Sequence, residues 1–304
     1  MIRIPAFAVA LTILATPAVQ AKSHDAASPA TITSCETISQ PGDYILASDI
    51  ALTVDNPSTG GGGDCLVITA SHVNIDMQDY SIGISCPFSC SPQEYGPVGT
   101  AGVHIMSGAN NVSIANGEVD NFMYGVLVEA DHASVDDFIS FNAIVALSLD
   151  NVSNSTFTDI SFGAGGLPYN FSVGPMVSVA GGGHNTFTEL TDTVSDSGVE
   201  VMNSSHNVVS QADISCSAVG EAGPGILLTG DSGHNLISDN NVDVLDGNGI
   251  EVDLGSDHNA IQGNTVSITS PAGDFAMYDK NPNCGHDLWI GNSFTNASPA
   301  SCIH

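Results

Sequence analysis

The sequence predicts an all-β solenoid in which short parallel strands, three to a coil, stack along one axis. A four-residue pattern that begins with His or Asn and ends with a β-branched or aromatic residue recurs about every 27 residues along the middle of the chain. Composition points the same way: the 304 residues include 32 glycines and only three Lys or Arg, unlike the Ala-, Glu-, Lys- and Leu-rich composition of helical proteins.

Each copy of the pattern is expected to open one coil. The copies begin at His72, Asn111, His132, Asn154, His184, His206, His234 and His258. A second apolar position follows most copies after about five residues, for example Val119 and Val242, and a Gly or Asn often stands between. This spacing predicts two short strands joined by a tight bend.

A third strand is predicted where a glycine opens a segment that alternates apolar and polar residues. Such segments begin at Gly102, Gly125, Gly198, Gly225 and Gly249. One face of each strand is expected to point inward, so stacking at about 4.8 Å supplies both backbone partners and a continuous apolar core. Roughly eight to ten coils fit the chain.

This pattern resembles the right-handed parallel β-helix of the pectate-lyase-like superfamily over roughly Cys35 to Cys302. The resemblance implies a single β-helix domain at 35–304 after a linker at 22–34. Residues 31–50 are expected to cap the first coil and 287–294 to form the closing coil, because capped ends prevent edge-to-edge association. The superfamily includes lyases, hydrolases, epimerases and adhesins, so the resemblance leaves function open.

Residues 1–21 have the pattern of a secretory signal peptide. Arg3 precedes an apolar run at 4–15, and small residues end the segment at Ala21. The apolar run is shorter than the ~20 residues that a membrane-spanning helix requires. We therefore expect export to the periplasm or the medium, without insertion into a membrane.

Export makes disulfides plausible among the seven cysteines. Position along the chain favours the pairs Cys35–Cys65, Cys86–Cys90 and Cys284–Cys302 and leaves Cys216 free, although spacing alone does not choose the connectivity.

The charge balance excludes several partners. Asp and Glu number 33, and the formal net charge is −30. Such a surface has no cations with which to release counterions from nucleic acid, and it repels anionic membranes and polyuronates. Lyases that this fold resembles use Arg or Lys as the base, whereas here only Lys280 remains in the folded region, outside the matched repeats. A neutral glycan is the better-matched ligand, and a monomer is expected.

The connection from the second strand to the Gly-led strand varies most in length. Insertions at 81–100, 163–174 and 216–225 are expected at one corner of the solenoid, beside the Gly-led sheet. Binding sites of repeat proteins tend to lie on such a side.

Candidate site residues are predicted on the outward face of the Gly-led sheet. They are His104, Glu200 and Glu251, with Asp253 two residues further along the last strand. Glu200 and Glu251 are expected two coils apart, or about 10 Å, and Glu251 and Asp253 about 7 Å apart. Carboxyl pairs separated by roughly 6.5 to 9.5 Å suit an inverting glycosidase, and His104 is a candidate for acid–base work.

Three functions remain open. The leading hypothesis is a secreted protein that engages extracellular carbohydrate along the Gly-led sheet. The second is a glycoside hydrolase that uses Glu200, Glu251 and Asp253 as its carboxylates. The third is a structural or adhesive surface protein stabilised by Ca²⁺ as its cofactor, because clustered carboxylates are hard oxygen ligands. With so many acids, a solvated acidic face also explains these residues.

Histidines recur at one corner of four successive predicted coils, at 184, 206, 234 and 258. Their imidazoles are expected about 4.8 Å apart. A regular ladder places ligands one above another instead of converging them on a metal ion, and Asn fills the same position in two other coils. We therefore interpret the ladder as a column of structural turn residues.

Overall fold

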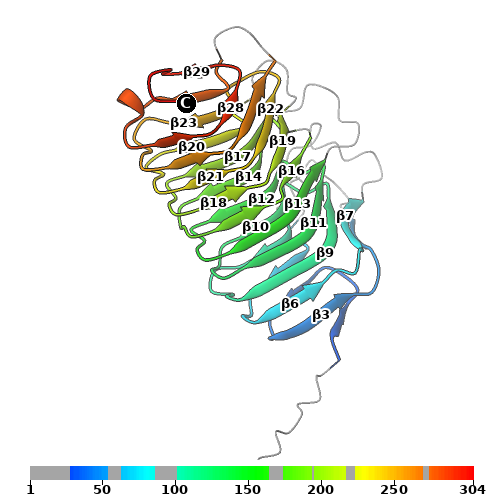
Figure 1. Ribbon diagram of the computed structural model, residues 1–304. Coiled ribbons are helices and arrows are strands. Elements are labelled where there is room, and N and C mark those ends of the chain that lie inside the picture. Colours follow the sequence, from blue (N-terminus) through cyan, green and yellow to red (C-terminus); the bar gives the residue numbers. More distant parts are fainter. Residues whose placement is uncertain are drawn as a thin grey trace, which may run out of the picture.

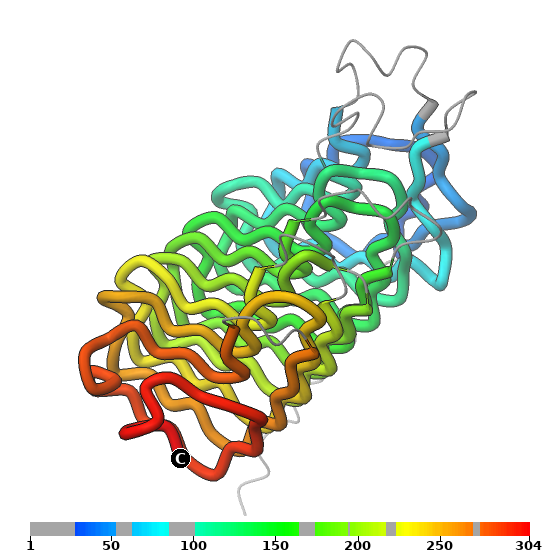
Figure 2. The backbone as a smooth tube through the Cα atoms, turned by 90° about the horizontal axis from the view of Figure 1, so that it is seen from above, coloured from blue at the N-terminus to red at the C-terminus, as the bar shows by residue number. Residues whose placement is uncertain are grey.

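The computed structural model describes residues 28–53, 63–85, 101–163, 174–193, 195–216, 223–269 and 274–304. Over these residues the chain is a parallel β-helix, with its N-terminal and C-terminal coils at opposite ends of the solenoid (Figure 1). Viewed from above, successive coils lie behind one another along the axis (Figure 2). No helix in the described ranges is long and apolar enough to cross a membrane.

The strands fall into three rows that run along the solenoid. Row 1 contains β1 (Ala30–Ile32), β3 (Gly42–Leu46), β6 (Val73–Asp76), β15 (Thr186–Thr188), β18 (Val208–Ser210), β21 (Leu236–Ser238), β24 (Ala260–Gln262) and β27 (Leu288–Ile290). Row 2 contains β4 (Ile50–Thr53), β7 (Ser81–Ser85), β16 (Thr191–Asp192), β19 (Asp213–Cys216), β22 (Asn241–Val244), β25 (Thr265–Ile268) and β28 (Ser293–Phe294). Three longer strands bend through both rows, namely β9 (Val112–Asp120), β11 (Ser134–Phe141) and β13 (Thr156–Gly163).

Row 3 is a separate parallel sheet of 11 strands among the described residues. It contains β2 (Glu36–Ile38), β5 (Leu66–Ile68), β8 (Ala101–Ile105), β10 (Tyr124–Val128), β12 (Val145–Asp150), β14 (Pro175–Ala180), β17 (Ser197–Met202), β20 (Ile226–Thr229), β23 (Ile250–Val252), β26 (Met277–Asp279) and β29 (Ala297–Ser298). In the described part of the chain, ten coils run from β3–β4–β5 to β27–β28–β29, which confirms the predicted fold and coil number.

The His or Asn that opens each repeat is a left-handed turn residue. All eight of these residues have φ between 57° and 62°. His and Asn are enriched at positive φ among residues with a side chain, whereas β-branched residues are strongly disfavoured there. The repeated pattern therefore marks the turn that leads into row 1, as the sequence indicated.

The glycines that announce row 3 are required by close packing against row 2. A Cβ on Gly225 would lie 2.3 Å from Cγ1 of Val242, and one on Gly249 would lie 2.2 Å from Cγ1 of Val266. Any side chain at these positions would displace the valine. Glycine therefore allows the row 3 strand to pack closely against the row 2 strand.

The interior of the solenoid is apolar. At its corners, buried asparagine side chains accept hydrogen bonds from backbone N–H groups. Phe157 and Phe187 stack at 5.1 Å between ring centroids inside neighbouring coils. At one corner, each side chain in a column donates through Nδ2 to Oδ1 of the next, in the order Asn185, Asn207, Asn235, Asn259 and Asp287. The same Oδ1 atoms accept backbone N–H groups, which would otherwise be buried without partners.

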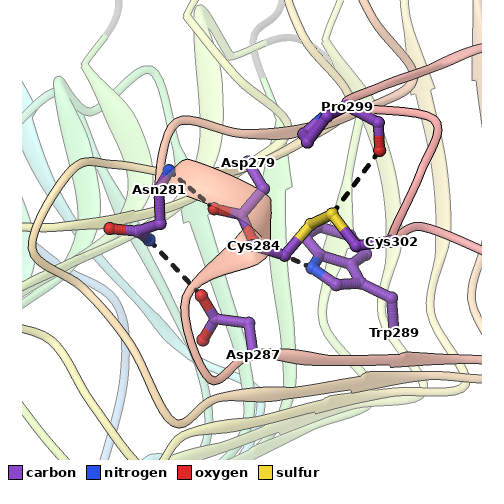
Figure 3. Close-up of a disulfide and its surroundings, with 7 residues drawn as sticks. All are labelled: Asp279, Asn281, Cys284, Asp287, Trp289, Pro299 and Cys302. Carbon is purple, nitrogen blue, oxygen red and sulfur yellow. Dashed lines mark hydrogen bonds between the residues drawn. A yellow bond between two sulfur atoms is a disulfide. The ribbon is translucent and has the colours of Figure 1, made fainter.

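Two of the predicted disulfides are present. Cys35 bonds to Cys65, Cys284 bonds to Cys302, and Cys216 is buried with a free thiol. The Cys284–Cys302 bridge lies against Trp289 in the closing coil, next to a 3-10 helix at Pro282–Cys284 (Figure 3). The predicted Cys86–Cys90 pair lies outside the described residues.

Of the remaining predictions about the chain ends and loops, one differs from the structure and others lie outside the described residues. Strand β1 lies inside the segment 22–34 that was expected to be a linker, and it pairs with β3. The predicted signal peptide at 1–21 lies outside the described residues, as do most of the insertions at 81–100, 163–174 and 216–225. Among the described residues, β7, β13 and β19 end in row 2 before these insertions, and β8, β14 and β20 of row 3 follow them.

Candidate functional site

One line of side chains crosses the outward face of row 3. The strand register places His104, Leu127, Ser148, Ser178, Glu200, Leu227, Glu251 and Tyr278 at equivalent positions of successive strands. Glu200 and Glu251 are therefore two strands apart on one wall, about 10 Å by the usual strand spacing. His104 is four strands from Glu200, or roughly 19 Å, so it cannot share a reaction centre with these carboxylates.

Lys280 forms ion pairs with two of the predicted site residues, Glu251 and Asp253. We call these three residues, together with Thr229 and Asn248, the lysine cluster. The ammonium group lies 2.6 Å from Oε1 of Glu251 and 3.1 Å from Oδ1 of Asp253. Asn248 donates to Glu251 (2.6 Å), and Thr229 donates to Asp253 (2.9 Å). The view of Lys280 as lying outside the repeats is wrong, because it directly follows β26 of row 3.

The cluster covers Glu251, which was expected to face solvent. Only 6% of Glu251 is exposed. Hydrogen bonding to Glu251 raises the pKa of Lys280, which keeps its ammonium group protonated. Partial burial acts to raise the pKa of Asp253, but hydrogen bonds from Lys280 and Thr229 outweigh burial and hold that pKa below its ordinary value. Asp253 is thus an ionised acceptor and a poor general acid, since a general acid needs a raised pKa.

Two half-exposed aromatic rings lie beside the lysine cluster. The ring centroids of Phe275 and Tyr278 are 5.2 Å apart, and Nζ of Lys280 lies 5.8 Å from the centroid of Tyr278. We call Phe275 and Tyr278 the aromatic pair. The pair was not predicted because Ala276 stands where a glycine opens five other strands of row 3. Alternation across Ala276, Met277 and Tyr278, with a small residue first, is the signal that could have found it.

His104 occupies a different environment near the N-terminal end of row 3. Its Nδ1 lies 2.6 Å from Asp64 and its Nε2 3.6 Å from Glu129, and only 8% of the residue is exposed. Nε2 is buried and makes no hydrogen bond. Glu129 also lines a polar hollow of about 440 Å³ at the corner between rows 3 and 1, together with Ser107, Gly108, Asn110, Ala130, Asp131, Asp150 and Asn151. His104 is thus held between two carboxylates and is largely covered from solvent.

The predicted histidine ladder is present and has a fifth rung. Ring centroids along His184, His206, His234, His258 and His286 are between 4.5 and 5.1 Å apart. The rings stack at the corner that precedes row 1, away from the outward face of row 3.

No protein-family model and no curated protein matches the chain. Solved structures do. Dettilon tailspike protein superposes with a TM-score of 0.62 at 15% identity over 86% of this chain and 53% of that one. The tailspike protein of E. coli bacteriophage HK620, solved in complex with a pentasaccharide, gives 0.57 at 13% identity over 86% and 57%. Pectate lyase Pel9A gives 0.51 at 14% identity over 86% and 71%.

These likenesses show the fold, which is a right-handed parallel β-helix. The resemblance read from the sequence is thereby confirmed at the level of the fold. The chain spans little more than half the length of either tailspike.

Proposed function

We propose that this protein is an exported, glycan-binding β-helix that holds a neutral carbohydrate chain along the outward face of row 3. The observation that carries the proposal is the aromatic pair beside the lysine cluster, on the same wall as Glu200. A wall of stacked strands offers equivalent positions at regular steps, which suits a ligand that is itself a chain of repeating units. Binding of a pentasaccharide by a tailspike of the same fold supports this choice.

The chemistry of the patch matches a sugar ring. Tyr278 and Phe275 offer apolar ring faces on which the C–H face of a pyranose can pack. Asp253 supplies carboxylate acceptors for sugar hydroxyls, and Lys280 supplies donors. An apolar platform with a few fixed polar groups is the usual composition of a small-ligand site.

The negative net charge of the chain favours a neutral glycan over an anionic one. The chain carries a formal charge of −30, and the one lysine on this wall is already paired with two carboxylates. A uronate or sulfated chain would meet repulsion with no free cation to offset it. A neutral glycan meets no such barrier.

Binding without cleavage is favoured over hydrolysis by the state of the carboxylates. Glu251 is covered by Lys280 and Asn248, and the pKa of Asp253 is held low. Neither is arranged as a proton donor to a glycosidic oxygen. One observation still supports a hydrolase. Glu200 and Glu251 lie two strands apart, about 10 Å, which is close to the carboxyl separation of inverting glycosidases.

Export is part of the proposal. It is supported by the signal-peptide pattern at 1–21 and by two disulfides, which persist in oxidising compartments.

A neutral-glycan array combined with a reducing-sugar assay tests the proposal. We expect retention of at least one neutral oligosaccharide without release of reducing ends, and loss of retention in Tyr278→Ala. Tyr44→Ala, which removes another half-buried tyrosine from row 1, is the matched control and should bind as the unmodified chain does. Release of reducing ends that disappears in Glu200→Gln and Glu251→Gln would establish the hydrolase instead. Binding equal in both tyrosine variants would place the site elsewhere.

A further inference from the structure

The histidine ladder ends in a cluster of three groups that could hold a metal ion. Asp257 and His258 come from one coil, and His286 comes from the next. Oδ1 of Asp257 lies 2.8 Å from Nδ1 of His258, and Oδ2 lies 3.3 Å from Nδ1 of His286. One ligand atom from each residue lies within 4.8 Å of those of the other two. The side chains are 42%, 47% and 69% exposed for Asp257, His258 and His286, so an ion in solution can reach them.

Only this part of the described ladder brings a carboxylate between two imidazoles. The residue before the ladder histidine is Gly183, Ser205 or Gly233 in the preceding coils, and Asp257 here. Stacked rings alone place nitrogen atoms one above another, which was the argument against a metal in the ladder as a whole. The carboxylate of Asp257 changes this geometry, because it contacts both neighbouring rings from the side.

The backbone that carries the cluster is fixed independently of any ion. Asn259, next to His258, donates its backbone N–H to Oδ1 of Asp287, next to His286, at 2.7 Å. Leu288 donates its N–H back to the carbonyl of Asn259 at 2.8 Å. Cys284, two residues before His286, is tied to Cys302. The two histidines are thus held in adjacent rungs, which lowers the entropy lost when both bind one ion.

We propose that Asp257, His258 and His286 form a binding site for a divalent transition-metal ion of the Zn²⁺ class, with water completing the coordination. Two imidazole nitrogens and one carboxylate oxygen are ligands that Zn²⁺ takes in tetrahedral sites. Ca²⁺ prefers oxygen ligands throughout and is not matched by this set.

The site is separate from the proposed glycan-binding face. Asp257 and His258 lie in the turn between β23 of row 3 and β24 of row 1, and no residue of the aromatic pair or the lysine cluster belongs to it. Metal binding and glycan binding can therefore be tested one at a time.

Titration calorimetry of the full, chelator-treated chain with ZnCl₂ tests the site, in excess CaCl₂ to occupy non-specific carboxylates. We expect one ion per chain at about pH 7.5. His258→Asn should weaken binding tenfold or more, as should His286→Gln and Asp257→Asn. Asn is the residue of choice at 258 because Asn111 and Asn154 already hold the same left-handed turn in other coils.

His206→Asn is the matched control. It makes the same substitution in the same ladder, at φ 61° against 62° for His258, but its neighbours are Ser205 and Gly233. This variant should bind Zn²⁺ as the unmodified chain does. Absence of Zn²⁺ binding, equal weakening by His206→Asn and His258→Asn, or unchanged affinity in Asp257→Asn would each overturn the proposal. Melting temperatures without metal confirm that each variant is folded.

Discussion

Asp287 accepts hydrogen bonds from both the backbone N–H and the side-chain amide of Asn259, at 2.7 and 3.0 Å. A carboxylate thus ends a buried column that asparagines build in the preceding coils. The nearby Asp279 is buried and accepts hydrogen bonds from the indole of Trp289 and the N–H of Asn281 (Figure 3). Two carboxyl groups thus lie close together at this end of the solenoid, and one of them, Asp287, occupies a column position that is a neutral amide in the preceding coils.

The first prediction concerns the pH dependence of stability. Burial raises the pKa of Asp287 to about 7, and the nearby Asp279 carboxylate adds to this shift. Because the folded pKa is above the unfolded value, the contribution of Asp287 to stability is complete below about pH 4 and is lost as pH rises through about 7. We expect the melting temperature to show this loss between about pH 4 and 7 after subtraction of the Asp287→Asn profile.

Asp287→Asn is the informative variant because an asparagine fills the equivalent position in each earlier coil of the column. Its Oδ1 can accept both hydrogen bonds from Asn259, so the variant should be at least as stable as the unmodified chain at pH 8. Parallel pH profiles for the two proteins would contradict the assignment of this titration to Asp287.

The second prediction concerns the amide column itself. Asn235 accepts from the backbone and side chain of Asn207 and donates to Asn259 and to the carbonyl of Ser204. Asn235→Ala leaves these buried groups without partners, and we expect a loss of about 3 kcal/mol in the free energy of unfolding. Asn241→Ala removes an exposed amide that bonds to Asp213 and should cost no more than about 0.5 kcal/mol. Equal losses by chemical denaturation would contradict the role of burial.

The third prediction concerns the lysine cluster. Removing one partner of a buried ion pair leaves a charge without compensation, which costs roughly 3–5 kcal/mol in a fully buried site. Lys280 is 37% exposed on its side chain, so we expect Lys280→Met to cost about 2 kcal/mol. The double variant Lys280→Met/Glu251→Gln should recover part of this loss, because no unpaired carboxylate then remains at 251. A single variant as stable as the unmodified chain would show that water already solvates Glu251.

The sequence predicted the coil architecture because each coil repeats the same local requirements. His or Asn at the left-handed turn and glycine where Gly249 approaches Val266 are constraints that a single coil expresses in its own residues. The disulfides Cys35–Cys65 and Cys284–Cys302 could be predicted from the positions of the cysteines along the chain, because each bond joins segments of adjacent coils.

The site was predicted less completely because its contacts depend on side chains of different coils. Glu251 was placed on the correct strand, but its burial results from Lys280 in the next coil and Asn248 before its own strand. Spacing along the sequence contains no information on which way a long side chain turns. For the same reason His104 could be assigned to its sheet, while its contacts with Asp64 and Glu129 could not.

The fourth prediction concerns the free thiol of Cys216. The residue is 2% exposed in row 2, and burial raises the pKa of its thiol to about 12, with the Asp192 carboxylate adding to the shift. The thiolate is the reactive form, so at pH 8 the folded protein should not react with an aromatic disulfide reagent over hours. One thiol per chain should react at once in guanidinium chloride if Cys86 and Cys90 form the predicted pair and the two described disulfides are intact. Fast reaction of the folded chain would mean that row 2 opens at this coil, and Cys216→Ala then tests whether the reacting thiol is this one.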